Sequence, residues 1–529
     1  MPGPPAKTGR GRALVVSRNH AAAEAGAAIL RAGGNAFDAA VAAGFVEAVI
    51  SPNNCGIGGY GAAGTGFLAK AGKLVSLDAD AVAPAAAKPD LFPTIPTPDP
   101  NSYKLPDDRH RKGPLSVAVP GVLGGLLMML ETWGRLPRQA VMAPAIRWAR
   151  EGVTLTAGQA ATWFAMRAEA EGRAAPTRPA GPTRVAMPLL ADTLEAIAAE
   201  GAEVFYAGRI GRAIADHLQK IGGILTREDM AAYQARIVEP VAIEFRGRRL
   251  ATTPPPSGGL TSLQIIALID RLDRNGRAGT LGHPERFEAF LETLKVVWED
   301  RLTTLADPQA MERPPASYLS AEHLDRLFER VQAGLDHPGP GRVVAPDPLR
   351  GTVHLAAADA EGNLVAWTQT HGGGFGSGVM VPGTEIVLGH GMCRFEPRPG
   401  WPNSVGPGKR PLHNMAPLLV IQNGRAALAA GASGGRTIIN NVAAIVLATL
   451  LDGRDAAGAL EAPRLQCETI EPAIVERSAG AECLAALRRR HRITEANRDA
   501  GVAHLILQGI DGWSAAAEPR ADGAGVVMA

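Results

Sequence analysis

Residues 351–378 decide the fold, and they read Gly351-Thr-Val-His-Leu-Ala-Ala-Ala-Asp359-Ala-Glu-Gly-Asn363-Leu-Val-Ala-Trp-Thr-Gln-Thr370-His-Gly-Gly-Gly-Phe-Gly-Ser-Gly378. Two alternating apolar runs lie in this stretch, Thr352–Asp359 and Leu364–Thr370. The four residues between them are a loop length typical of a β-hairpin. We therefore expect a hairpin that begins abruptly at Thr352.

The chain before this hairpin is mainly helical in its pattern. Small apolar residues predict helices over His20–Arg31 and Ala36–Ile50, with Asn35 as an N-cap and Asp38 as its capping partner. Further helical patterns cover Leu123–Trp133, Ala140–Glu151, Ala191–Glu200 and Gly208–Ile221. Eight prolines between Val82 and Pro114 predict a long surface loop instead.

The chain after the hairpin has the pattern of strands. Apolar segments at Val379–Leu388, Met415–Gln422 and Ala426–Ala430 continue it, and a helix over Asn440–Leu451 follows. A strand pair is also expected in Ile237–Thr252. The abrupt change of pattern after Gly351 indicates a boundary in the chain.

Composition excludes several classes of protein. A length of 529 residues allows about three ordinary domains, and 62 glycines with 41 prolines indicate a globular, loop-rich chain. The 54 Lys and Arg nearly balance the 52 Asp and Glu, without a basic stripe. Nucleic-acid binding and membrane-surface binding are therefore not expected.

Cysteine spacing and hydropathy bring further expectations. The four cysteines are far apart and lack metal-ligand spacing, which excludes a zinc finger and a disulfide framework. No window of about 18 apolar residues and no signal-peptide pattern occur, so we expect a cytoplasmic protein. Gly56–Gly61 fits a dinucleotide fingerprint but follows no strand. Asp107, Asp108 and His110 lie in the proline-rich loop and are expected to be solvated. No metal and no cofactor are expected.

Cleavage before Thr352 would create a reactive residue. An N-terminal threonine carries a hydroxyl and a free α-amine, and an amine with a pKa near 7.7–8 can act as general base for the adjacent hydroxyl. Gly351 leaves room for that hydroxyl to attack the preceding carbonyl. The Gly351–Thr352 bond is therefore a candidate self-cleavage site.

Several segments resemble the γ-glutamyltranspeptidases, in the family's order and over nearly the whole chain. The hairpin stretch resembles the start of the family's small subunit. The other matching segments are Gly33–Ala43, Gly56–Gly59, Pro120-Gly121, Pro254–Gly259, Pro407–Pro411, Met415–Pro417 and Gly431–Gly435. The segment from His413 to Pro417 is also similar to the oxamate-amidohydrolase-like branch of this superfamily.

This resemblance implies an α+β fold, the four-layer αββα sandwich of the N-terminal-nucleophile hydrolases. It implies a precursor that cleaves itself into a large subunit, 1–351, and a small subunit, 352–529, interleaved in one fold. Thr352 would be the nucleophile and Thr370 the residue that hydrogen-bonds it. The backbone N–H groups of Gly434 and Gly435 would form the oxyanion hole, and two glycines let consecutive amides converge on a developing oxyanion.

The family's substrate contacts are changed in this chain. The family binds the donor's α-carboxylate with an arginine, where Asp80 stands here, and its α-amino group with an aspartate, where Arg394 stands. Paired serines are replaced by His413 and Asn414, and an asparagine by Gly372. We expect a changed acyl group, with Arg394 suited to a carboxylate or other acceptor. The alternatives are an Asp80–Arg394 pair with a related substrate, or an alignment shift of one residue.

The resemblance implies a lid loop and leaves three alternative functions. Residues 395–404 match the family's lid loop, in which Trp401 could cover a bound acyl group. The leading hypothesis is a self-processing amidohydrolase or acyl transferase for a small amide. The second is a true γ-glutamyl hydrolase or transferase, and the third is an unprocessed homologue that binds without catalysis. The sequence does not decide the oligomeric state.

Overall fold

The computed structural model describes residues 5–98, 102–342, 351–498, 501–520 and 523–529. Residues 343–350, just ahead of the expected cleavage bond, lie outside the described residues. Within the described ranges no helix combines the length and the apolar character needed to cross a membrane. The cytoplasmic location stays a prediction.

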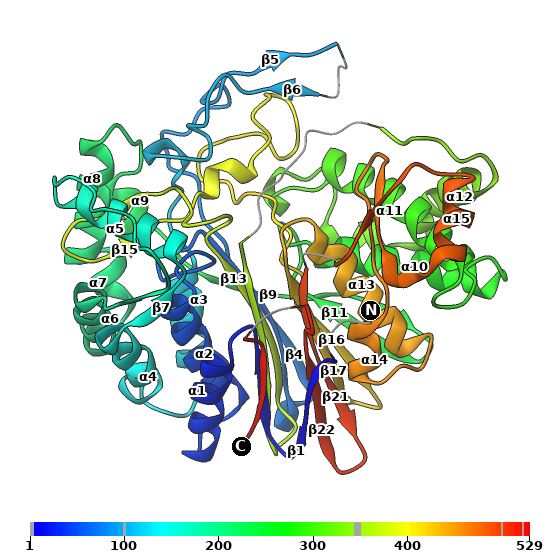
Figure 1. Ribbon diagram of the computed structural model, residues 1–529, viewed down its shortest axis with the longest axis horizontal. Coiled ribbons are helices and arrows are strands. Elements are labelled where there is room, and N and C mark those ends of the chain that lie inside the picture. Colours follow the sequence, from blue (N-terminus) through cyan, green and yellow to red (C-terminus); the bar gives the residue numbers. More distant parts are fainter. Residues whose placement is uncertain (1–4, 99–101, 343–350, 499–500, 521–522) are drawn as a thin grey trace.

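Two seven-stranded sheets form the centre of the molecule (Figure 1). The first has the strand order β1-β22-β21-β17-β16-β11-β10 and the second the order β23-β2-β12-β13-β3-β4-β9. The strands of the first sheet are β1 Lys7–Gly11, β10 Val241–Phe245, β11 Arg248–Thr252, β16 Leu418–Gln422, β17 Arg425–Ser433, β21 Val502–Gly509 and β22 Gly512–Ala517. Those of the second are β2 Leu14–Ser17, β3 Gly61–Leu68, β4 Lys73–Ala79, β9 Arg236–Val238, β12 Val353–Ala358, β13 Leu364–Thr370 and β23 Gly525–Met528.

Helices cover the outer face of each sheet, so the molecule has four layers, as Figure 1 shows. The second sheet is covered by α1 His20–Arg31, α2 Ala36–Ile50 and α3 Val122–Trp133, with α4 Arg138–Glu151, α5 Ala157–Ala170, α6 Pro188–Glu200, α7 Ala202–Tyr206, α8 Arg209–Lys220 and α9 Arg227–Ala231 beyond them. The first is covered by α10 Gly259–Arg274 and α13 Thr437–Leu450, with α11 Pro284–Thr304, α12 Ala321–Asp336, α14 Ala456–Glu461 and α15 Ala481–Arg488. The expected αββα sandwich is confirmed.

Short elements complete the chain. They are β5 Ile95–Pro96, β6 Tyr103–Lys104, β7 Val153–Leu155, β8 Thr183–Val185, β14 Met380–Val381, β15 Ile386–Val387, β18 Leu465–Gln466, β19 Ala473–Glu476 and β20 Ile493–Ala496, with 3-10 helices at Ala69–Ala71, Pro114–Ser116, Pro308–Ala310, Pro315–Leu319, Gly391–Arg394 and Arg477–Ala479. Strands β5 and β6 form an arm that protrudes at the top of Figure 1.

Small residues fill the space between the two sheets. Ala356 and Ala366 of the second sheet pack there against Leu419 and Ala429 of the first, together with Ile506. All five are buried. Side chains at alternate positions of β12 and β13 therefore point into the inter-sheet space, because successive strand residues face opposite sides.

The chain on either side of Gly351 contributes to both sheets. Strands β1, β10 and β11 of the first sheet precede residue 351 and its other four follow it, while β12, β13 and β23 of the second sheet follow it. The two expected subunits are thus parts of one interleaved fold rather than separate domains.

Most sequence-based expectations for the elements agree with the structure. Helices α1 and α2 have the predicted bounds, and the Asn35 side chain accepts from the backbone N–H of Asp38 in a complete capping box. The predicted strand character of Val379–Leu388 is split into β14 and β15, because Pro382 and Gly383 begin a turn in which Gly383 has φ +74.

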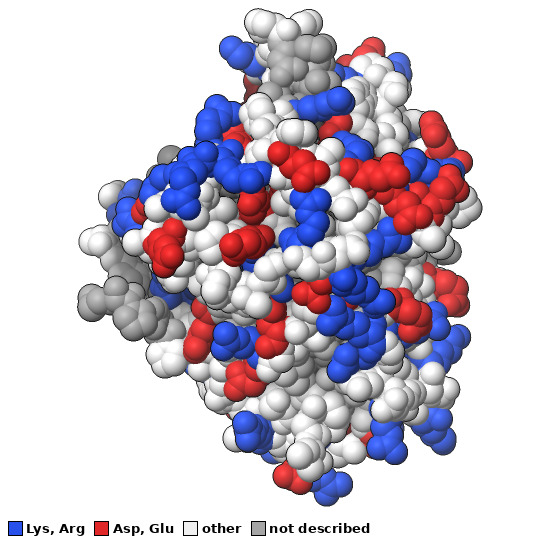
Figure 2. Space-filling view, turned by 90° about the vertical axis from the view of Figure 1, so that its right-hand side faces the viewer, with Lys and Arg blue, Asp and Glu red and all other residues white. Residues whose placement is uncertain are grey.

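The distribution of charges and the state of the cysteines also agree with what the sequence predicts. Figure 2 shows basic and acidic side chains mixed across one face, and ion pairs such as Arg271–Asp325 and Arg326–Glu322 lie on α10 and α12. No disulfide joins the four cysteines, Cys55, Cys393, Cys467 and Cys483, all of which lie in the described ranges.

Candidate active site

Four neighbouring strands of the second sheet place the expected nucleophile in a row of residues. The register is fixed by the pairs Val353 with Gln369, Thr370 with Gly61, and Ala62 with Ala79. Thr352 directly precedes β12, and Asp80 directly follows β4. Continuing the register by one residue aligns Thr352, Thr370, Gly61 and Asp80 in a row across the four neighbouring strands. Directly opposed residues of antiparallel strands point to the same face, so this row lies on the face that looks toward the first sheet.

Thr352 and Thr370 surround the carbonyl of Gly351. Thr352 is 5% exposed, and its Oγ1 lies 2.6 Å from Gly351 O and 3.1 Å from Thr370 Oγ1. Thr370 Oγ1 accepts from the Gly372 N–H at 2.8 Å and lies within hydrogen-bonding distance of Gly351 O. The proton of the Thr370 hydroxyl therefore points at the carbonyl that Thr352 would attack.

Glycines make room for this arrangement. A Cβ on Gly351 would lie 3.1 Å from Gly373 Cα, so the main chain ahead of Thr352 packs directly on the glycine-rich loop. Gly372 has φ +102, and a Cβ there would collide with His390 Nε2 at 2.3 Å. His390 thus fills the space that a side chain at position 372 would need.

Gly434 and Gly435 form a tight turn between β17 and the start of α13. Their φ values are +135 and +70, a region that glycine enters without the steric cost of a Cβ. A Cβ on Gly434 would lie 2.6 Å from Thr437 Oγ1 and 2.9 Å from Gly501 Cα. The turn lies directly ahead of α13, whose N-terminus carries partial positive charge, so the helix dipole favours negative charge beside it.

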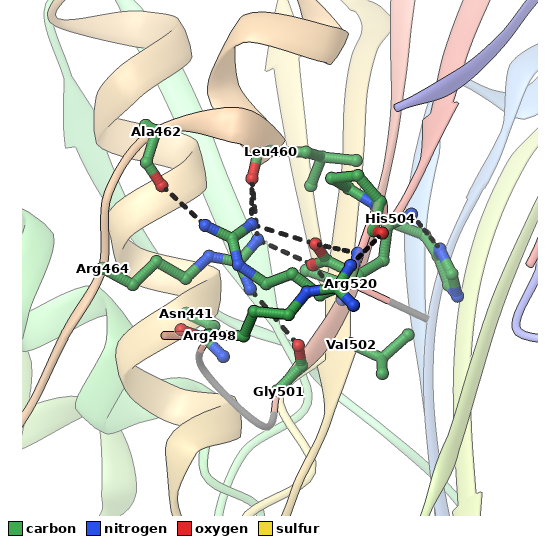
Figure 3. Close-up of polar contacts among 12 residues, drawn as sticks. Asn441, Leu460, Ala462, Arg464, Arg498, Gly501, Val502, His504 and Arg520 are labelled. Atoms are coloured by element: carbon green, nitrogen blue, oxygen red, sulfur yellow. Dashed lines mark hydrogen bonds and ion pairs between the residues drawn. The ribbon is translucent and has the colours of Figure 1, made fainter. Parts of the chain in front are cut away.

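A buried ion network contacts Gly501, the residue next to this turn, and Figure 3 shows its members Arg464 and Arg520. Arg464 donates to Gly501 O at 3.4 Å and to Glu518 Oε2 at 2.7 Å, and Glu518 also accepts from the Ala503 N–H at 3.0 Å. Arg520 bonds Glu518 at 3.0 Å. The network fixes Gly501, which packs against Gly434. The sequence gives no local signal for it, because its members are spread over three separate segments.

Arg520 also binds a second carboxylate. Its Nε and Nη2 lie 2.7 and 2.6 Å from the two oxygens of Glu476, and its Nη1 donates to Leu460 O at 2.6 Å. Two cations thus balance two anions, and the desolvation of each charge is offset by its partner.

Asp80 and His413 form the other end of the row. Asp80 Oδ2 lies 2.7 Å from His413 Nε2, and both side chains are fully buried. A Cβ on Gly61 would lie 2.7 Å from Asp80 Oδ1, so the carboxyl leans over Gly61 toward Thr370. Burial raises the pKa of Asp80 to about 7, and burial lowers the pKa of His413 to about 3.

Arg410 binds both Asp78 and Asp80 at this end of the row. Its Nη1 donates to Asp78 Oδ1 at 3.0 Å and to Asp80 O at 3.1 Å, and its Nη2 to Gln234 O at 2.7 Å. Burial raises the pKa of Asp78 to about 6, against the lowering effect of Arg410. Sequence reasoning did not single out Asp78 or Arg410, although Arg410 lies in a motif that it used.

Arg394 and Asn414 lie on either side of these residues. Arg394 donates to Gly372 O at 3.1 Å, and its Cζ is 5.8 Å from the centre of the Tyr60 ring. Asn414 is half-buried, and its carbonyl faces Gly258, where a Cβ would approach to 2.7 Å. Arg394 is therefore linked through Gly372 to Thr370, whereas the main chain of Asn414 lies against Gly258.

The expected lid contacts the protruding arm. The Cζ atom of Arg398 lies 4.9 Å from the Tyr103 ring centre and 4.7 Å from that of Trp401. Arg398 also pairs with Glu396 at 2.8 Å. A cation between two aromatic rings thus joins the segment 395–404 to β6.

One group of residues outside this site has metal-ligand spacing. In the described ranges the possible ligands are Glu292, Glu471 and His491. Lys295 Nζ lies 2.6 Å from Glu292 and 3.0 Å from Glu471, so an ammonium group already compensates these carboxylates. In the proline-rich loop Asp107 instead binds the backbone and side chain of Arg109.

This chain is similar to known proteins over nearly its whole length. The family model described as Gamma-glutamyltranspeptidase matches residues 22–528. The Acylase ACY 1 proenzyme of Pseudomonas sp. (strain SE83) is 33% identical over 542 residues, 98% of this chain and 94% of that protein. The Glutathione hydrolase proenzyme of Escherichia coli (strain K12) is 30% identical over 537 residues, 96% of this chain and 90% of that protein. The crystal structure of cephalosporin acylase from Bacillus halodurans superposes with a TM-score of 0.82 at 27% identity, over 99% of this chain and 96% of that one.

Proposed function

Because this chain belongs to the gamma-glutamyltranspeptidase family, we propose that it is a self-processing N-terminal-threonine amidohydrolase or acyl transferase with an altered acyl specificity. The precursor cleaves itself between Gly351 and Thr352 into residues 1–351 and 352–529. The observation that carries the proposal is the pair of threonine hydroxyls at Gly351 O. The proenzyme relatives support the processing step.

Self-cleavage begins with attack of Thr352 Oγ1 on the carbonyl carbon of Gly351. The hydroxyl of Thr370 donates to the carbonyl oxygen as negative charge develops on it. The peptide C–N bond breaks, the nitrogen takes the proton that the hydroxyl loses, and an ester links Gly351 to Thr352. Water then hydrolyses the ester and leaves Thr352 with a free α-amine.

Turnover repeats the attack on an external amide. The α-amine of Thr352 accepts the hydroxyl proton, and Oγ1 forms a bond to the substrate carbonyl. Gly434 and Gly435 stabilise the oxyanion, the leaving amine takes the proton, and an acyl-enzyme remains. Water releases the acyl group as an acid, or an amine accepts it in a transfer.

The acyl site supports a substrate other than a γ-glutamyl amide. An α-amino-acid head needs a cation for its carboxylate and an anion for its ammonium, and here Asp80 and Arg394 stand in the reversed places. Asp80 is bound to His413 rather than to an external cation. A charge-assisted hydrogen bond contributes about 1.5–3 kcal/mol, so the reversal weakens binding of this head strongly. We infer an acyl group with an acceptor end near Arg394.

Processing is tested on purified protein. The precursor has a mass of 55.0 kDa, and the wild type should give two bands on a denaturing gel, with Thr352 as the N-terminal residue of the smaller one. Thr352→Ala should stay uncut, and Thr352→Ser should be cut because it keeps a hydroxyl. A wild-type protein that stays at full length on prolonged incubation refutes the proposal and favours a non-catalytic binding protein.

The similarity to the Escherichia coli glutathione hydrolase favours a second candidate, a true γ-glutamyl hydrolase or transferase. A γ-glutamyl anilide and an anilide of an acyl group without the α-amine separate the two. A kcat/KM higher for the γ-glutamyl anilide contradicts the altered specificity.

A further inference from the structure

The two oxygens of Asp80 have different surroundings. Oδ2 is bound to His413 Nε2, whereas Oδ1 is buried, lies over Gly61 and accepts no hydrogen bond from an N–H or hydroxyl group of the described residues. Gly61 is paired with Thr370, and both belong to the row that begins at Thr352. Asp80 Oδ1 takes the place that a Gly61 side chain would fill, with Met415 Cε 3.4 Å from that position, so this oxygen lies on the Thr370 side of Asp80 in the row.

The tautomer of His413 follows from its contacts. Its Nδ1 lies 3.2 Å from the Met415 N–H, a group that can only donate, so Nδ1 is the acceptor and carries no proton. A neutral imidazole has one N–H, which must then be on Nε2 and donates to Asp80 Oδ2. When Asp80 is protonated, its proton therefore sits on Oδ1, the oxygen over Gly61.

The reach from Thr352 to this oxygen suits a short acyl chain. Adjacent strands lie about 4.8 Å apart, so Gly61 is roughly 10 Å from Thr352 along the row. One hydrogen bond and an extended chain of about five carbons cover this distance, since each C–C bond is about 1.5 Å long.

We propose that Asp80 Oδ1 selects the acyl group, as a hydrogen-bond donor when the carboxyl is protonated and as an acceptor when it is ionised. This inference rests on the proposed function and specifies its acyl site. The protonated form favours an acyl chain that ends in a carboxylate, and the ionised form favours one that carries an ammonium group. Asp80 is thus a specificity-determining residue whose preference changes with pH.

The charged groups around Asp80 keep the pH at which its preference changes within the range of ordinary enzyme assays. The titratable and charged groups around the Asp80–His413 pair are Asp78, Arg410 with Asp307 and Tyr233 near it, Arg301, which donates to His413 O, and Arg394, whose charge adds to the effect of burial in lowering the pKa of His413. Burial raises the pKa of Asp80 to about 7, while a hydrogen bond between the Asp78 and Asp80 carboxyl groups and, less strongly, the charge of Arg410 act in the opposite direction. Asp78 is the paired partner of Arg410, so Arg410 does not neutralise Asp80 alone.

The test compares glutaryl p-nitroanilide with γ-glutamyl p-nitroanilide, two acyl groups of equal chain length, of which only the second bears an ammonium group. The ratio of their kcat/KM values cancels the ionisation of the Thr352 amine, which both reactions share. In the wild type this ratio should fall by about tenfold or more between about pH 5.5 and about pH 8.5. In Asp80→Asn, whose amide cannot titrate but still accepts from His413, the ratio should change by less than about twofold.

Each outcome tests either the role of Asp80 alone or that role together with the proposed function. A wild type that hydrolyses both anilides with a pH-independent ratio overturns the role of Asp80 alone, as does an equal fall in Asp80→Asn. A wild type that hydrolyses neither overturns the proposed function and this inference together. If Asp80→Asn does not fold, Gly61→Ala is the second variant: its methyl group, 2.7 Å from Oδ1, displaces that oxygen and should flatten the ratio.

Discussion

Removing the Thr370 hydroxyl should slow self-cleavage while the fold is retained. In Thr370→Val the side chain keeps its shape, but Gly351 O loses the donor aimed at it and the Gly372 N–H loses its acceptor. Losing one donor to a developing oxyanion costs about 10²–10³ in rate, or about 2.7–4 kcal/mol. Leaving the Gly372 N–H buried and unpaired costs a further ~1–3 kcal/mol of folding free energy.

The rate of processing is measured on fresh precursor by the disappearance of the full-length band on a denaturing gel. Thr370→Ser is the matched control, because it keeps the hydroxyl and loses only a methyl group, and it should process within about tenfold of the wild type. Thermal unfolding of each variant separates slow chemistry from a damaged fold. Processing of Thr370→Val at the wild-type rate would refute the role assigned to this hydroxyl.

Three further substitutions test the parts of the site separately. Arg464→Met leaves Glu518 buried without this partner and should lower the free energy of unfolding by about 3–5 kcal/mol in urea titration; it should also lower kcat more than it changes KM, with partial rescue in Arg464→Lys. Gly434→Ala should lose about 10²-fold or more in kcat, whereas Gly424→Ala, also at positive φ but with open space around it, should keep its activity. Burial raises the pKa of Asp80 above its unfolded value, so its contribution to stability is complete below the unfolded pKa and is lost as pH rises through about 7. The Tm of Asp80→Asn relative to the wild type should therefore increase from about pH 5 to about pH 8, and a constant difference would contradict the buried carboxyl.

The sequence predicted the elements wherever a local pattern determines them. Helix α2 is an example, because Asn35 and Asp38 form the capping box that its sequence predicts. The division of Val379–Leu388 into β14 and β15 was missed, although Pro382-Gly383 is a local turn signal in the sequence. The family resemblance implied the four layers, but the pairing order of the two sheets was not predicted, because no local pattern specifies which strands are neighbours.

For the site, the sequence identified residue types but not their partners. Thr352 and Thr370 were predicted to interact, and they do so through hydroxyl groups 3.1 Å apart. Asp80 and Arg394 were expected either to bind substrate or to pair, whereas the short contact of Asp80 is with His413. Asp80 and His413 are 333 residues apart in the sequence, and only the packing of the two sheets against each other brings them together.

The row across β12, β13, β3 and β4 has the proposed nucleophile at one end and the residue proposed to select the acyl group at the other. At its near end the threonine hydroxyls bond main-chain groups, Gly351 O and the Gly372 N–H, which do not depend on neighbouring side chains. At its far end Asp80 is held by His413, a side chain that a single substitution removes. Gly61 separates the two ends without a side chain of its own. Substitutions at Asp80 or His413 should therefore change the acyl group accepted while Thr352 still cleaves the precursor.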